Sequence, residues 1–135
     1  MDDTMLRVPP HRLRVRYAET DQMGVAHHAA YLPWLEEARI VALGQLGFAY
    51  RRCEEQGLFM PVHALEISYR RPLRFDDVVE IRTQIAAQGR TRLCFTSTLH
   101  RDEVLIANAV VSVAATDAQG RVCRLPEALM SAIGG

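Results

Sequence analysis

Residues 17–39 read YAETDQMGVAHHAAYLPWLEEAR and hold the features that decide the fold. The stretch runs from the end of an alternating strand, through a polar loop with one glycine, into a largely apolar helix. Pro33 fixes where that helix starts, because proline is tolerated only in the first turn, where its missing N–H would have no partner. We therefore expect the helix to begin between Ala29 and Leu32 and to run to about residues 44–47.

The start of this helix places a carboxylate close to free backbone donors. The N–H groups between His28 and Tyr31 lack partners inside the helix, and the positive end of the helix dipole lies behind them. Asp21 lies a few residues earlier in the loop. A carboxylate can attack a carbonyl or deprotonate water, and free N–H groups can hold the developing oxyanion. The pattern indicates an acyl-transfer site, although Asp21 could instead only cap the helix or bend the turn.

The rest of the chain predicts an antiparallel sheet. Residues 12–18 alternate like a half-buried strand, behind an arm formed by residues 1–10, and residues 48–56 could form a second short helix. Further strands are expected at 59–70, 78–87, 91–101, 104–116 and 121–125, followed by a short tail after Pro126 that could be helical.

One long helix followed by hairpins is typical of an α+β fold, with the helix packed on one face of a sheet. Apolar residues surround most of the long helix, which predicts that it is enclosed. The strand at 104–116 is so apolar that it suits a sheet centre or a subunit interface.

Composition excludes several classes of protein. A chain of 135 residues is one domain. Its 16 basic and 16 acidic residues balance, so no large net charge would attract nucleic acid or a membrane surface. No run approaches the ~20 apolar residues of a membrane span, and the N-terminus lacks the apolar core of a signal peptide. Three cysteines without CxxC spacing suggest a reducing cytoplasm. Every basic residue is arginine, so an anion site must use guanidinium groups or backbone amides.

The motif in the opening stretch resembles that of the hotdog-fold acyl-CoA thioesterases. The likeness is greatest to the 4-hydroxybenzoyl-CoA thioesterase group and its Tol–Pal-associated, YbgC-type members. A second, weaker match is Tyr69-Arg70-Arg71-Pro72 with Asp76-Asp77, and the likeness covers about residues 10–126 of the single domain 1–135. The residues that match the first motif are Glu19, Thr20, Asp21, Gly24, Val25, His28, Tyr31, Glu36, Ala38 and Arg39.

The resemblance implies a sheet of about five antiparallel strands wrapped around one long central helix. It implies a homodimer at least, with a homotetramer favoured, and active sites at the dimer interface. The catalytic aspartate carries over to Asp21 and the backbone oxyanion donor to His28. Substrate binding carries over to Gly24, Val25 and Tyr31. No metal or cofactor is implied, since coenzyme A is part of the substrate and product.

The resemblance leaves the acyl preference open, because two positions beside the acyl site depart from the family. Position 23 is Met where many relatives have Gly, and position 27 is His where relatives often carry an aromatic residue. Adjacent histidines at 27 and 28 could suggest a metal, but they lack a third ligand at suitable spacing.

Three further residues are candidates beyond the loop. Glu36 is three residues before Arg39, so a helical ion pair is expected, yet some hotdog enzymes use a helix glutamate as the base. Arg90 and Arg92 follow a glycine turn and would share one face of a strand. They are either a solvated strand edge or, as in relatives, ligands of the coenzyme A phosphates.

The sequence therefore favours a cytoplasmic homo-oligomeric thioesterase acting on an acyl-CoA or acyl-carrier thioester. One alternative is a hotdog hydratase or dehydratase, which usually pairs a catalytic histidine with an acidic residue, and the D-x-x-G loop argues against it. Another is a non-catalytic acyl-thioester binder or interaction module, which the fold alone would permit. Asp21 beside a free helix N-terminus argues against that alternative.

Overall fold

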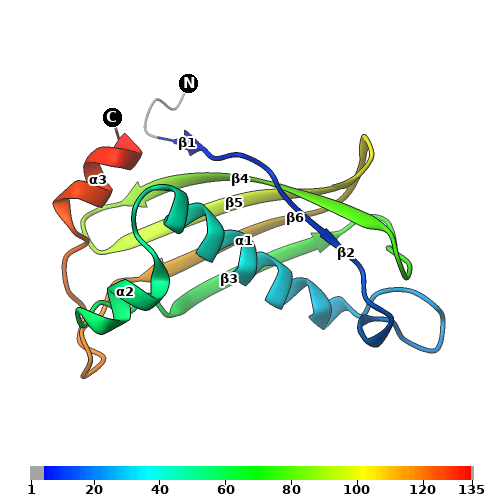
Figure 1. Cartoon of the computed structure of the whole chain (residues 1–135), viewed down its shortest axis with the longest axis horizontal. Coiled ribbons are helices and arrows are strands. Elements are labelled where there is room, and N and C mark those ends of the chain that lie inside the picture. Colours follow the sequence, from blue (N-terminus) through cyan, green and yellow to red (C-terminus); the bar gives the residue numbers. More distant parts are fainter. Residues whose placement is uncertain (1–4, 135) are drawn as a thin grey trace.

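The computed structural model describes residues 5–134 and consists of one antiparallel sheet with a long helix across one face (Figure 1). The strand order is β1-β4-β5-β6-β3, and β2 also pairs with β4. The predicted α+β class is confirmed, with six strands where about five were expected. In chain order the elements are β1 Leu6–Arg7, β2 His11–Arg14, η1 Tyr17–Glu19, η2 His28–Ala30, α1 Tyr31–Gln45, α2 Tyr50–Glu55, β3 Val62–Tyr69, β4 Val78–Gln88, β5 Arg92–Arg101, β6 Val104–Ala114 and α3 Glu127–Gly134.

Alternation along the two central strands builds the core between the sheet and α1. Every second residue of β4 and β5 is buried, as the period of two requires. Burying one large apolar side chain contributes about 1.5–3 kcal/mol, so this layer is the main stabilising contact of the fold. Its members include Val79, Ile81, Ile85, Leu93, Phe95 and Leu99 from the sheet, and Trp34, Leu35, Ala38, Ala42 and Leu43 from α1.

The helix begins where Pro33 predicts, but it is not enclosed. Pro33 is the third residue of α1, inside the first turn. Leu32, Ile40 and Val41 remain 42%, 36% and 37% exposed. Within residues 5–134, therefore, part of the apolar surface of α1 is left uncovered. No helix of the described residues is long and apolar enough to cross a membrane.

Three segments differ from the sequence-based prediction. The first predicted strand stops at Arg14, because Arg16 and Glu19 form a capping box that turns the chain into η1. The predicted N-terminal arm contributes β1, which pairs with β4, while its first four residues lie outside the described part. Residues 121–125 make a single bridge, Thr116 to Val122, because the chain leaves the sheet at once for α3.

The two edges of the sheet differ. β1 and β2 lie one after the other along β4 and cover that edge. At the other edge β3 pairs only with β6 among the described residues, and its Val62, Leu65 and Tyr69 are 47%, 44% and 47% exposed. The apolar strand β6 lies between β5 and β3, so of its two predicted places, a sheet centre or a subunit interface, the structure shows an inner position in the sheet.

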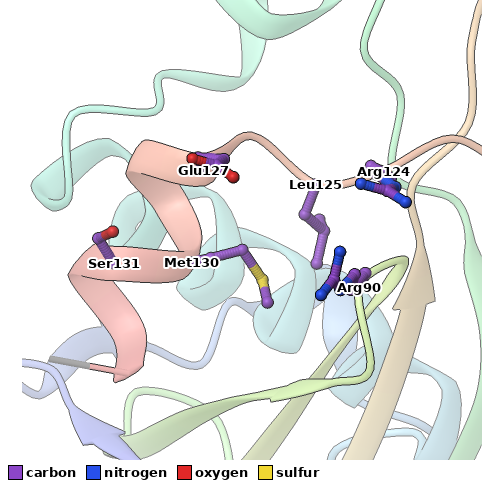
Figure 2. A pocket seen from close by; sticks show the side chains of 6 residues that line it. All are labelled: Arg90, Arg124, Leu125, Glu127, Met130 and Ser131. Carbon is purple, nitrogen blue, oxygen red and sulfur yellow. The ribbon is translucent and has the colours of Figure 1, made fainter.

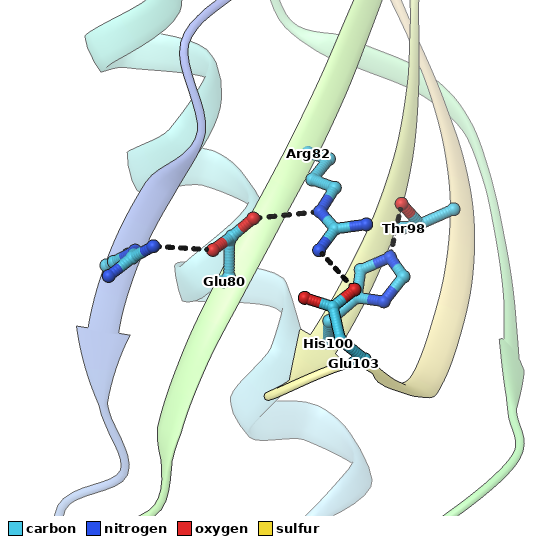
Figure 3. A network of polar contacts seen from close by, with 6 residues as sticks. Glu80, Arg82, Thr98, His100 and Glu103 are labelled. Carbon is cyan, nitrogen blue, oxygen red and sulfur yellow. Dashed lines mark hydrogen bonds and ion pairs between the residues drawn. The ribbon is translucent and has the colours of Figure 1, made fainter.

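The sheet face turned away from α1 carries a chain of ion pairs (Figure 3). Arg82 Nε donates to Glu80 at 2.8 Å and Arg82 lies 3.5 Å from Glu103, while Arg12 lies 3.0 Å from Glu80. The hydrogen bond from Arg82 lowers the pKa of Glu80, and burial opposes it. Exposed pairs of this kind contribute little to stability, so we assign the cluster to strand register rather than to chemistry.

Candidate active site

The loop between η1 and η2 is a tight turn that holds Asp21 by its backbone. The Asp21 N–H donates to the Val25 carbonyl at 2.9 Å, and the Gly24 N–H donates to the Asp21 carbonyl at 2.9 Å. Gly24 has a φ of 81°, a conformation that favours glycine. A bridge between Thr20 and Ala26 closes the base of the turn. The position of Asp21 is therefore fixed from both sides.

The Asp21 carboxylate uses one oxygen to stabilise the turn. Its Oδ1 accepts the Met23 N–H at 2.9 Å and the Val25 N–H at 3.3 Å. Within residues 5–134, Oδ2 forms no hydrogen bond. The two interpretations of Asp21 are thus compatible, because one oxygen bends the turn while the other is available to a substrate.

A surface hollow of about 640 Å³ lies beside this carboxylate. Of the two adjacent histidines it is His27, not His28, whose side chain shares the hollow with Asp21. Among the described residues no group of three His, Cys, Asp or Glu side chains is placed to hold a metal ion. The residues lining the hollow are Tyr17, Thr20, Asp21, Gln22, Met23 and His27.

The turn that leads into α1 leaves the predicted donor free. The His27 N–H donates to the Glu19 carbonyl at 2.8 Å, and the Ala30 N–H donates to the His27 carbonyl at 3.0 Å. The Tyr69 hydroxyl donates to the His28 carbonyl at 2.7 Å. Within the described chain, the N–H groups of His28 and Ala29 have no acceptor. The N–H groups on either side of this pair, those of His27 and Ala30, are thus bonded, whereas the predicted donor and its neighbour Ala29 are not.

Glu19 ties this turn to the core. Its Oε2 accepts the Trp34 indole N–H at 2.9 Å, and its Oε1 accepts the Arg16 N–H at 2.8 Å. Partial burial raises the pKa of Glu19, but the hydrogen bonds from Arg16 and Trp34 outweigh it, so the pKa of this carboxyl is lowered. An ionised Glu19 therefore holds η1 against α1, and its carbonyl holds His27.

Tyr31 lies deeper than its predicted role in substrate binding suggests. Its side chain is 3% exposed, and its ring packs on Trp34 and Tyr69 with centroid distances of 4.9 Å in both cases. Burial, reinforced by the neighbouring Tyr69, raises the pKa of Tyr31 to about 12. In the single chain it is a core residue beneath the helix start, whereas Val25 is half-buried in the loop.

Glu36 and Arg39 do not form the expected ion pair. No salt bridge joins them in the described chain, and Glu36 lies with Arg39 in a separate hollow of about 320 Å³ between α1 and β3. Arg39 is 7% exposed and its buried Nε has no hydrogen-bond partner within residues 5–134. Burial lowers the pKa of Arg39, opposed by Tyr50 and Glu36. The structure therefore does not bring Glu36 into the hollow that Asp21 lines.

The turn between β4 and β5, which contains Arg90 and leads into Arg92, lies at the opposite end of the sheet from the loop that precedes α1 (Figure 1). Arg90 is in the turn before β5 rather than on the strand, so the predicted common face with Arg92 is not formed. Arg90 instead meets Arg124 in a hollow of about 320 Å³ beside α3, with Leu125 and Met130 in its wall (Figure 2). Glu127 also lines this hollow.

The backbone joins the two sides of that hollow, because the Leu125 N–H donates to the Arg90 carbonyl at 2.8 Å. In the described part of the chain, neither Arg90 nor Arg124 forms an ion pair. Two free guanidinium groups beside one carboxylate leave a net positive site.

Sequence reasoning gave no role to three residues that the structure places at these sites. Glu19 and Tyr69 belong to the matched motifs, but the Glu19 bond to His27 depends on how the loop folds back, and the Tyr69 bond to His28 joins residues 41 positions apart. Arg124 belongs to no motif in the sequence. Its position beside Arg90 depends on the path of the chain between β6 and α3.

Comparison with known proteins identifies relatives across most of the chain. Residues 23–107 match the profile of a family described as the thioesterase superfamily, a range that begins two residues after Asp21. The chain is 32% identical over 118 residues to the acyl-CoA thioester hydrolase YbgC of Escherichia coli O6:H1, covering 87% of this chain and 86% of YbgC.

Two further comparisons agree with this match. The chain is 41% identical over 80 residues to YneP of Bacillus subtilis, covering 59% of this chain and 58% of YneP, less than two thirds of that relative's length. The crystal structure of the hypothetical protein TT1821 from Thermus thermophilus superposes with a TM-score of 0.87 at 40% identity, covering 92% of this chain and 95% of TT1821.

Proposed function

This chain belongs to the thioesterase superfamily, and from that premise we propose that it hydrolyses an acyl-coenzyme A thioester to a free carboxylate and coenzyme A. The hotdog fold that the sequence predicts is confirmed by the family and by the solved structures. The observation that carries the proposal is Asp21. Within residues 5–134 its Oδ2 forms no hydrogen bond, and its loop leads to two N–H groups without acceptors at the start of α1.

The Asp21 carboxylate would start the reaction at the thioester carbonyl by one of two routes. As a nucleophile, Oδ2 forms a bond to the carbonyl carbon, the C–S bond breaks, coenzyme A leaves as thiolate and takes a proton, and water cleaves the mixed anhydride. As a base, Asp21 accepts a proton from water while the water oxygen attacks the same carbon; the C–S bond then breaks, and coenzyme A leaves as thiolate and takes the proton from Asp21. After a single turnover in ¹⁸O-water, label in the Asp21 carboxylate would identify the anhydride route, because the base route cannot place it there.

The backbone N–H of His28 would stabilise the oxyanion that both routes generate. It has no acceptor within residues 5–134, it lies at the start of a helix, and the N–H groups of His27 before it and Ala30 after it are already bonded. Donors fixed before the reaction cost no reorganisation when charge develops, which is why such groups contribute more than their number suggests. Gly24 and Val25 would support the acyl group beside the loop, with Tyr31 beneath it.

Arginines at the far end of the sheet would bind the coenzyme A phosphates. Arg90 and Arg92 were predicted for this role, and Arg124 adds a second guanidinium group to the hollow that holds Arg90. Because lysine is absent, phosphate recognition falls to arginine forks. Glu36 remains the lesser candidate for the base, in the hollow beside Arg39.

A homodimer, favoured to assemble further into a homotetramer, would bring the two ends together. Arg92 pairs with Ala114, next to the Val62 end of β3, whereas His28 is bonded to Tyr69 at the other end. Antiparallel pairing of two β3 strands around a two-fold axis would place one subunit's Val62 end beside its partner's Tyr69 end. The phosphate site of one subunit would then serve the acyl site of the other.

A hydrolysis screen over short, long and aromatic acyl-CoAs, read by free thiol, tests the proposal. We expect Asp21→Asn to fold normally and to lose activity by about a hundredfold or more, since it removes the base or nucleophile.

Asp117→Asn is the matched control. Asp117 Oδ1 accepts the N–H groups of Gln119 and Arg121 at 2.9 Å, which lie two and four residues later in the sequence, as the partners of Asp21 do in its turn. Near-normal turnover in Asp21→Asn would eliminate the mechanism, and equal losses in both variants would indicate a turn defect instead.

A further inference from the structure

We propose that Tyr69, the last residue of β3, is a positioning residue that fixes the peptide units holding the thioester carbonyl. The inference rests on the proposed function and concerns the same site. Its basis is the hydrogen bond from the Tyr69 hydroxyl to the His28 carbonyl at 2.7 Å, which joins residues 41 positions apart.

The turn that carries the free donors has little to hold it by itself. η2 spans only three residues, His28–Ala30; the Ala30 N–H donates to the His27 carbonyl at 3.0 Å, and the Tyr31 N–H at its C-terminal end donates to the Ala29 carbonyl. Short 3₁₀ turns have poorer hydrogen-bond geometry than α-helix. Contacts from outside the turn therefore decide how rigidly it presents its N–H groups, and Tyr69 supplies one of them.

Tyr69 is itself held firmly enough to act as a support. Its backbone pairs with Ala107 of β6, and its ring meets the Tyr31 ring edge-on, with centroids 4.9 Å apart and an interplanar angle of 89°. Tyr31 is 3% exposed and packs in turn on Trp34. Although Tyr69 is 47% exposed, its hydroxyl is thus directed at the turn by a buried aromatic cluster.

The bond also acts on the peptide that it touches. The carbonyl of His28 and the N–H of Ala29 belong to one peptide unit, and that N–H has no acceptor in the described chain. A donor on the carbonyl polarises the unit and strengthens its N–H as a donor. Burial raises the pKa of Tyr69, so the phenol keeps its proton at neutral pH and can serve as this donor.

Tyr69→Phe isolates the hydroxyl, because phenylalanine keeps the ring contact with Tyr31. Tyr50→Phe is the matched control, since the Tyr50 hydroxyl also donates to a backbone carbonyl, that of Met60 at 3.3 Å, away from the loop. Losing an oxyanion donor costs about 10²–10³ in kcat, so loosening one should cost about tenfold. We expect Tyr69→Phe to lower kcat by about that factor with KM unchanged, and Tyr50→Phe to leave both as in wild type.

Amide hydrogen exchange, followed by NMR, supplies a readout that needs no turnover. We expect the Ala30 amide, which is bonded to His27, to exchange faster in Tyr69→Phe than in wild type or Tyr50→Phe. Unchanged kcat, a loss confined to KM, an equal loss in both variants, or unchanged Ala30 exchange would each overturn the proposal. If wild type hydrolyses no acyl-CoA, the proposed function fails, and the exchange rate of Ala30 alone decides whether Tyr69 positions the turn.

Discussion

Replacing His28 with proline tests the oxyanion donor directly, because proline removes the N–H of that residue alone. The backbone can accept it. His27 has a φ of −58° and a ψ of 144°, the extended conformation that residues before proline prefer. His28 is the first residue of η2, where proline's fixed φ is suited to a helix start. Since the His28 N–H has no acceptor within residues 5–134, no internal hydrogen bond is lost and the melting temperature should stay close to wild type.

The kinetic cost should be large and confined to the chemical step. Removing one preorganised donor lowers kcat by about 10²–10³, or about 2.7–4 kcal/mol of transition-state stabilisation, with little change in KM. His28→Ala is the control, because it removes the imidazole and keeps the N–H. Free thiol release from the best acyl-CoA of the screen measures both variants. If His28→Pro turns over at the wild-type rate, or if His28→Ala loses as much, the backbone N–H is not the donor.

The remaining predictions concern binding, pH and assembly. Arg90→Ala with Arg92→Ala should raise KM for acyl-CoA and spare an acyl-pantetheine with the same acyl group; equal losses on both substrates would point to a folding defect, and no loss to a solvated strand edge. Because the pKa of Glu19 is lowered in the folded state, this carboxylate adds stability that is present above its unfolded pKa and is lost as the pH falls through its folded pKa. The difference in melting temperature between wild type and Glu19→Gln should therefore be full at pH 7 and vanish in acid. Light scattering should give at least twice 15.2 kDa for wild type, and Leu65→Lys on β3 should shift the mass towards one chain; a wild-type mass near 15.2 kDa would contradict the shared site.

The elements that sequence predicted well are those whose cause is local. Pro33 fixes the start of α1 because the ring excludes every position beyond the first turn, whatever surrounds the helix. The strands β4 and β5 follow from alternation that matches a half-buried sheet. Residues 121–125 carried a similar signal, but a strand also needs a free neighbour to pair with, and the chain provides only one bridge there.

The candidate site was predictable in its chemistry and less so in its supports. Asp21 and the helix start could be found because both lie in one stretch of sequence. Tyr69 and Arg124 could not be assigned roles, because their positions depend on sheet register and on the path of the chain after β6. For Arg90 and Arg92 the strand period of two predicted a common face. That prediction does not hold because Arg90 lies in the turn, where side chains no longer alternate as on a strand.

The exposed end of β3 would make the turnover rate depend on protein concentration. Tyr69 is the last residue of β3, which among residues 5–134 is paired along one side only, and the last pairs of such an edge strand fray most readily. A second copy paired along that edge would suppress the fraying and so steady the hydroxyl on His28. At protein concentrations too low for dimers to form, the chains would then still fold but release thiol slowly. The turnover rate per chain would therefore rise with protein concentration.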